Sequence, residues 1–119
     1  MQHLNNHAKI LRRAAKILAK QPKLCQGYLH DPDGNYCMLG AILKVLRIDT
    51  DQDWNDKLES MDIVQDLAMV ALEDFHPEYK CLADWNDEPG RTALEAAQLL
   101  RQVADHFDEQ DRRFYADED

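Results

Sequence analysis

Apolar residues recur at helical spacing along the first part of the chain. Over residues 4–20 they fall on one face and the cations lie mostly off it, which predicts an amphipathic helix that Pro22 ends. The residues of this face are Leu4, Ala8, Leu11, Ala14, Ala15 and Leu18. Two heptad-like units are too few for a coiled coil, so we expect the face to pack into the core.

Two later stretches have the same period. A third helix is predicted before His76-Pro77, with the apolar stripe Met61, Val64, Leu67, Ala68, Ala71, Leu72 and Phe75. A fourth begins after Thr92, because Thr92-Ala93-Leu94-Glu95 has the pattern of a capping box with Thr92 as the N-cap. Its expected buried face is Ala93, Ala96, Ala97, Leu100, Val103, Ala104 and Phe107. A shorter second helix is predicted from Cys37 or Met38 to Arg47.

A turn separates the first two predicted helices. Asp31-Pro32-Asp33-Gly34 is typical of a tight turn, because Pro fixes φ and Gly supplies a positive φ. Short flanking segments then predict a small β-hairpin around residues 24–37, which helices would have to cover. The chain is thus predicted to be mainly α: a compact four-helix domain with this hairpin, spanning residues 1–119, with an acidic tail over 109–119 whose end frays.

Special residues concentrate in two segments, 27–41 and 84–92. We interpret each as a device that begins a helix, combining a Pro/Gly turn with an aromatic anchor. In the second, Trp85 is expected to anchor the loop on the core and Pro89-Gly90 to make the bend. Asn86 and Asp87 are expected to hydrogen-bond the turn's own backbone. Arg91 is expected to pair with Asp84 or Asp87, with anion binding at the helix start as the alternative.

The charge of the chain is unevenly distributed. The net charge is −9, yet residues 1–30 carry six bases and no acid. The acidic remainder repels phosphate, which disfavours direct nucleic-acid binding, and the basic charges are expected to face the acidic body and water. No apolar run is long enough to span a bilayer. Three cysteines without a CxxC motif indicate reduced thiols in a cytoplasm.

Cys37 is the main candidate for catalysis. A thiol at a helix N-terminus has a lowered pKa, and a base is available in His30, His76 or His106. Asp87 or Asn86 would orient that base, so the candidate catalytic set is Cys37, His76 and Asp87. The opposing interpretation is a core residue, because free cysteine is among the most buried residue types.

Metal binding is not predicted. The suitable side chains do not have the regular spacing of a zinc site; they are Cys25, His30, Cys37, His76 and Cys81. Residues 31–35 alternate oxygen donors, but the glycine stands at the fourth position of the loop instead of the sixth, and Ile42 at the twelfth. There is no phosphate-binding glycine motif either, so no cofactor is predicted.

The motif residues resemble a small, functionally uncharacterised family of bacterial and bacteriophage proteins. They are Cys25-Gln26-Gly27, Gly34-Asn35-Tyr36-Cys37-Met38-Leu39-Gly40-Ala41 and Trp85-Asn86-Asp87-Glu88-Pro89-Gly90-Arg91-Thr92. The resemblance covers residues 24–107, and the last motif is the most specific. It implies a compact domain and a phage or mobile-element origin, and it implies no activity.

These observations favour a binding protein over an enzyme. The leading hypothesis is a small acidic cytoplasmic accessory module that binds another protein with a basic surface. Its candidate contact is the acidic connector 49–56, with Trp54, Asp51 and Asp53, while a lid over the core is an equal interpretation of Trp54. The alternative is a cysteine-dependent hydrolase or transferase using Cys37. The oligomeric state is left open.

Overall fold

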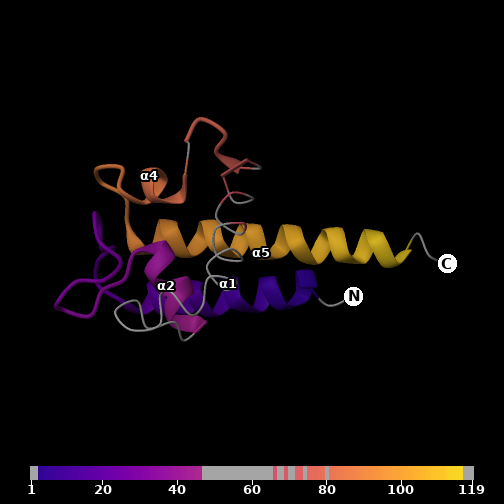
Figure 1. The fold of residues 1–119 in the computed structure, drawn as a ribbon, viewed down its shortest axis with the longest axis horizontal. Coiled ribbons are helices and arrows are strands. Elements are labelled where there is room, and N and C mark those ends of the chain that lie inside the picture. The colour runs from indigo at the N-terminus through magenta and orange to yellow at the C-terminus, as the bar shows by residue number, and fades with distance from the viewer. Residues whose placement is uncertain are drawn as a thin grey trace.

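Two long helices form the frame of the structure. The computed structural model describes residues 3–46, 66, 69, 72, 73, 75–79 and 81–116. The helices whose two ends fall within these residues are α1 (His3–Lys20), α2 (Met38–Val45), α4 (Leu82–Asn86) and α5 (Ala93–Ala116). α1 and α5 lie side by side and run in opposite directions, and α2 and α4 gather where α1 ends and α5 begins (Figure 1). None of the helices in the described ranges is long and apolar enough to cross a membrane.

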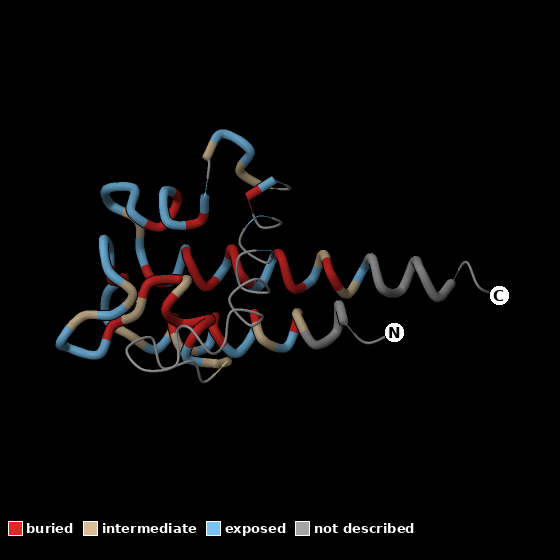
Figure 2. Tube along the Cα trace, in the orientation of Figure 1, coloured by how far each residue is buried: buried red, intermediate tan, exposed pale blue. Residues whose placement is uncertain are grey.

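The faces of α1 and α5 that touch are the ones that the apolar period predicts. In α1 the buried residues are Ala8, Leu11, Ala14, Ala15 and Leu18. In α5 they are Ala93, Ala96, Ala97, Leu99, Leu100, Val103, Ala104 and Phe107. The buried positions of both helices lie along their facing sides (Figure 2). Because many of them are alanine, the two backbones can approach closely. The mainly helical fold is therefore confirmed.

Arg12 connects α1 to the acidic side of α5. Its Nη2 lies 2.8 Å from Asp105 Oδ1 and 2.6 Å from Asp108 Oδ2. Hydrogen bonds to Asp105 and then to Asp108 raise the pKa of the Arg12 guanidinium. Because this group is about half exposed, water screens the pair and its contribution to stability is small. The other cations of α1 from residue 9 onward are exposed to water.

The predicted β-hairpin is wrong. Around residues 24–37 the chain forms a loop with one isolated antiparallel bridge, between His30 and Tyr36, and the described residues contain no strand. The bridge is closed by two hydrogen bonds, from Asp31 N to Asn35 O at 2.9 Å and from Cys37 N to Leu29 O at 3.1 Å, and α2 begins at Met38 directly after it. The N–H and C=O groups of Tyr36 point away from His30 and bond to the Gln21 side chain at 3.0 and 2.7 Å. Gly27, with φ of 84°, turns the chain away. Hence the ladder cannot extend past a single bridge.

The turn inside this loop forms as predicted. Gly34 has φ of 87° and donates its N–H to Asp31 O at 3.1 Å. The Asp31 carboxylate accepts hydrogen bonds from the backbone N–H groups of Asp33 and Asn35, and from the Asn35 side chain. These donors, led by the backbone N–H of Asn35, lower the pKa of Asp31.

One helix and two helix ends differ from the prediction. α4 was not predicted, because the motif around Trp85 was interpreted as a loop. α2 ends at Val45, and α5 continues to Ala116 through part of the predicted acidic tail. Of the third predicted helix, the described members of the apolar stripe are Leu72 and Phe75, both helical, with Leu72 buried. The rest of that stripe lies outside the described residues.

Candidate functional site

Asn86 joins the two motif segments. It lies at the end of α4 and is buried with 2% of its surface exposed. Its Oδ1 accepts a hydrogen bond from Met38 N at 2.9 Å, and its Nδ2 donates to Cys25 O at 2.9 Å and to Asp87 Oδ1 at 3.0 Å. A side-chain amide can serve both kinds of backbone group at once. The expectation that Asn86 bonds the turn's own backbone is therefore wrong: it satisfies the first segment instead.

Two further side chains, those of Asp87 and Gln26, form hydrogen bonds between the two motif segments. Asp87 Oδ1 accepts a hydrogen bond from Gly27 N at 3.0 Å, so this side chain too reaches across to the first segment instead of its own turn. In return, Gln26 Nε2 donates to Asn86 O at 2.9 Å and to Glu88 O at 2.8 Å. The two segments thus form one unit whose side chains satisfy each other's backbone groups.

The start of α2 lies directly against the backbone of the loop. Cys37 is the N-cap of α2, and its N–H donates to Leu29 O at 3.1 Å. A Cβ on Gly40 would collide with that same carbonyl oxygen, so only glycine fits there. The N-terminal amides have partners, because Asn86 accepts from Met38 N and Cys37 Sγ accepts from Gly40 N at 3.2 Å. With these two donors satisfied internally, α2 offers no ready anion-binding N-terminus.

The pKa of Cys37 is raised, contrary to the sequence-based prediction. Its position at a helix N-terminus is confirmed, and hydrogen bonds from the backbone of Gly40 and Leu39 lower the pKa. Burial of the thiol outweighs them, because desolvation penalises the thiolate. Burial also raises the pKa of Cys25. Cys37 is therefore a neutral thiol at neutral pH, which does not favour a nucleophile.

The three members of the candidate catalytic set do not come together. Cys37 and Asp87 line one pocket, and no histidine is among the described residues that line it. His76 instead packs against the rings of Trp85 and Tyr79, with ring centroids 5.6 and 6.2 Å away. Its Nδ1 lies 3.4 Å from Glu78 Oε1. The other two candidate bases contact aromatic rings elsewhere: His30 lies near Tyr36 and His106 near Phe75.

A surface pocket of about 180 Å³ lies where the two segments meet. Its lining comes from the loop, from the start of α2 and from α4, and consists of Gly27, Tyr28, Leu29, Cys37, Leu39, Leu82, Ala83, Asn86 and Asp87. Most of these side chains are apolar, and Asp87 supplies the one carboxylate of this lining. Tyr28 is 77% exposed, whereas Leu82 is buried. The pocket therefore combines a fixed apolar wall with an exposed aromatic ring.

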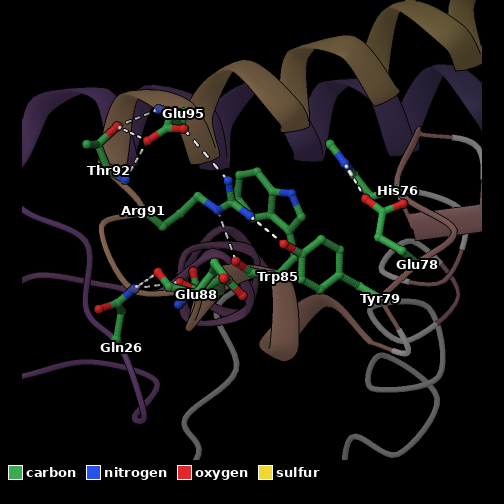
Figure 3. Close-up of polar contacts among 10 residues, drawn as sticks. Gln26, His76, Glu78, Tyr79, Trp85, Glu88, Arg91, Thr92 and Glu95 are labelled. Atoms are coloured by element: carbon green, nitrogen blue, oxygen red, sulfur yellow. Dashed lines mark hydrogen bonds and ion pairs between the residues drawn. The ribbon is translucent and has the colours of Figure 1, made fainter.

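Trp85 and Arg91 form a second cluster, against the start of α5 (Figure 3). Trp85 is buried in the core, as predicted, and the Arg91 guanidinium stacks on its ring at 3.8 Å from the centroid. Arg91 Nε donates to Trp85 O at 3.1 Å, and Arg91 Nη2 donates to Tyr79 OH at 3.2 Å. Its carboxylate partner is Glu95, at 3.7 Å, so the predicted pairing with Asp84 or Asp87 is wrong. Arg91 is thus held by the protein itself.

The capping box at the start of α5 is confirmed. Glu95 N donates to Thr92 Oγ1 at 3.1 Å, and Thr92 N donates to Glu95 Oε1 at 3.0 Å. Gly90 precedes it with φ of 84°, a left-handed conformation that glycine adopts without strain. This bend and cap set the direction in which α5 leaves the motif. Gly90 and Thr92 therefore have the structural roles expected of them.

Some candidates are not placed by the structure. Trp54, Asp51 and Asp53, with the connector 49–56, lie outside the described residues. Among the residues that are described, no group of three His, Cys, Asp or Glu side chains is arranged to hold a metal ion. The described cysteines are free: Cys25 and Cys37 are buried and Cys81 is exposed.

The pocket contains residues that the sequence reasoning did not select. Tyr28, Leu39 and Ala83 line the pocket, although no motif chemistry distinguishes them in the sequence. Gln21 was not selected, and Gln26 entered only as part of the family motif, although each satisfies two backbone groups far away in the sequence. One signal was available for Tyr28, because aromatic residues are enriched in protein interfaces. No comparable signal marks Gln21, whereas Gln26 stands in the motif Cys25-Gln26-Gly27.

Residues 3–106 match the model of one protein family, described as a family of unknown function, DUF6197. No curated protein matches the chain. No solved structure matches it either. The expected membership of an uncharacterised family is thus confirmed, and a bacterial or bacteriophage origin stays a prediction.

Proposed function

Because the chain belongs to DUF6197, whose function is unknown, we propose a function from its own geometry: the protein is a small binding module that docks another protein at the pocket between the two motif segments. The observation that carries this proposal is the exposed ring of Tyr28 beside an apolar pocket. Aromatic residues over apolar concavities are characteristic of protein interfaces.

The rigidity of the pocket supports docking. Asn86, Asp87 and Gln26 fix the loop against α4 through hydrogen bonds of 2.8 to 3.0 Å. A preformed concavity loses little conformational entropy when a partner binds. The surrounding charge supports a basic partner, because Asp84, Asp87 and Glu88 are exposed on α4 and just after it, in a chain of net charge −9.

The broader setting remains part of the proposal. Free thiols are consistent with a cytoplasmic protein. The motif resemblance supports a phage or mobile-element accessory protein, and Trp54 with the acidic connector is a second candidate contact. The cysteine-dependent enzyme is the weaker alternative: Cys37 lines the pocket, but its thiol is buried and no histidine is in the lining among the described residues.

A matched pair of variants tests the docking surface. Tyr28→Ala removes the exposed ring at the pocket, and Leu94→Ala removes an exposed apolar side chain (61%) outside the lining. Both substitutions should leave the urea midpoint unchanged, because neither side chain is buried. Nuclease-treated lysate is passed over each immobilised protein, and the captured proteins are then purified and retested one at a time. We expect a protein that binds wild type and Leu94→Ala but is lost with Tyr28→Ala. Equal capture by all three proteins, or no capture by any, would overturn the proposal.

A further inference from the structure

The carboxylate of Asp87 is fixed at one oxygen and open at the other. Oδ1 accepts hydrogen bonds from Gly27 N and Asn86 Nδ2, each at 3.0 Å. Oδ2 has no hydrogen bond to any described residue, and Asp87 is exposed where it lines the pocket. The two bonds at Oδ1 orient the group without occupying its second oxygen. Asp87 is thus a negatively charged hydrogen-bond acceptor held in a fixed position.

No other lining residue carries a charge at neutral pH. Burial keeps Cys37 a neutral thiol, because it raises the pKa of that group. The Asn86 amide is directed to the backbone of Cys25 and Met38. Leu29, Leu39, Leu82 and Ala83 supply apolar surface. The lining therefore has an apolar body with one negative point, which suits a ligand with an apolar stem and a cationic head.

The size of the pocket narrows the class of ligand. Its 180 Å³ corresponds to about six waters at roughly 30 Å³ each. Pockets for drug-sized molecules are commonly about 300–1,000 Å³, so this one is suited to a single side chain. Tyr28, exposed at the edge, can place its ring face against a cation that approaches Asp87.

We propose that the pocket binds a lysine or arginine side chain of the partner, with the aliphatic stem on the apolar wall and the charged head on Asp87 Oδ2. The inference rests on the proposed docking function and names its chemistry. The proposal makes the Asp87 carboxylate the group that selects a cationic side chain, whereas binding of an apolar side chain would need no carboxylate. The two possibilities differ in how binding responds to removal of that charge.

Asp87→Asn is the decisive variant. An asparagine oxygen can still accept from Gly27 N and Asn86 Nδ2, so the loop contact is kept while the charge is removed. Asp84→Asn is the matched control, because Asp84 is an exposed acid of α4 that does not line the pocket. The probes are Nα-acetyl-lysine amide and Nα-acetyl-arginine amide, whose side chains keep their charge, and the uncharged Nα-acetyl-norleucine amide. Binding to isotope-labelled full-length protein is followed by the NMR shifts of the Gly27, Leu39 and Ala83 amides.

We expect saturable shifts with the two cationic probes and about tenfold weaker binding of both to Asp87→Asn, the loss of one charge-assisted hydrogen bond. Asp84→Asn should bind as wild type does. Equal binding of the norleucine probe, or unchanged binding to Asp87→Asn, would overturn the cationic assignment and leave the docking function standing. An absence of shifts with all three probes would also overturn it. The docking function itself fails only in the Tyr28 experiment.

Discussion

Replacing Asn86 with aspartate tests whether this side chain holds the two segments together. The exchange keeps the shape of the residue and retains the oxygen that accepts from Met38 N. It converts the donor Nδ2 into an oxygen, which then faces Cys25 O and Asp87 Oδ1, previously at 2.9 and 3.0 Å. Two attractive contacts become repulsive, and the site remains buried.

The expected loss in the free energy of unfolding is about 3 kcal/mol at neutral pH. Leaving the buried carbonyl of Cys25 without its donor costs about 1–3 kcal/mol. Placing a carboxylate in a buried position beside the Asp87 charge adds a comparable amount, unless the new group becomes protonated. Replacing an exposed amide with an acid neither leaves a buried carbonyl unpaired nor buries a charge.

The loss should shrink as the pH falls. Burial and the neighbouring charge of Asp87 will raise the folded-state pKa of the new carboxyl above its unfolded value of about 3.9. As pH rises, the new carboxyl therefore loses its proton first in the unfolded chain. The loss in the free energy of unfolding grows between the unfolded pKa of about 3.9 and the higher folded pKa. Below about pH 4 the protonated group can donate to Cys25 O, and most of the penalty disappears.

Urea denaturation monitored by circular dichroism provides the measurement. Wild type, Asn86→Asp and the control Gln98→Glu, an exposed amide on α5, are compared at about pH 7 and about pH 4.5. The reasoning is refuted if Asn86→Asp costs less than about 0.5 kcal/mol, the usual range of surface substitutions. It is also refuted if the loss matches that of Gln98→Glu, or if it is the same at both pH values.

Three further outcomes are expected. Gly40→Ala should lower the free energy of unfolding by about 2 kcal/mol, because the collision with the loop backbone outweighs the roughly 1 kcal/mol gained in helix propensity. A higher urea midpoint would contradict this. In thiol labelling at neutral pH, Cys81 should react quickly and Cys25 and Cys37 slowly, with all three reacting after unfolding. Rapid labelling of Cys37 in the folded protein, located by mass spectrometry, would restore the enzyme alternative. Because the folded pKa of Asp31 is lowered, it stabilises the protein above its unfolded pKa of about 3.9 and loses that contribution as pH falls. The urea midpoint of Asp31→Asn should therefore fall less than that of wild type between about pH 4.5 and about pH 2.5, and equal falls would refute this role.

The helical frame was predictable because it depends on local periodicity. The buried faces of α1 and α5 repeat at the helical period, so the sequence alone identifies them. The capping box at Thr92 and the turn at Asp31 are likewise local, since their donors and acceptors lie within four residues of each other. The hairpin failed because α2 begins at Met38, directly after the bridge, where Met38 N donates to Asn86 Oδ1 from forty-eight positions away, and because Gly27 turns the other segment aside.

By itself, then, the sequence determined the helices, their buried faces and the turn and cap that direct the chain. Only the tertiary structure decided that Asn86 and Asp87 bond to the backbone of residues 25–38 instead of their own turn. It also decided that burial raises the pKa of Cys37 despite its place at a helix N-terminus. The physical reason is common to both. The partner of a polar side chain and the burial of a thiol both depend on which distant segments pack together. Here those segments lie 48 to 61 residues apart along the chain, and no local pattern encodes their approach.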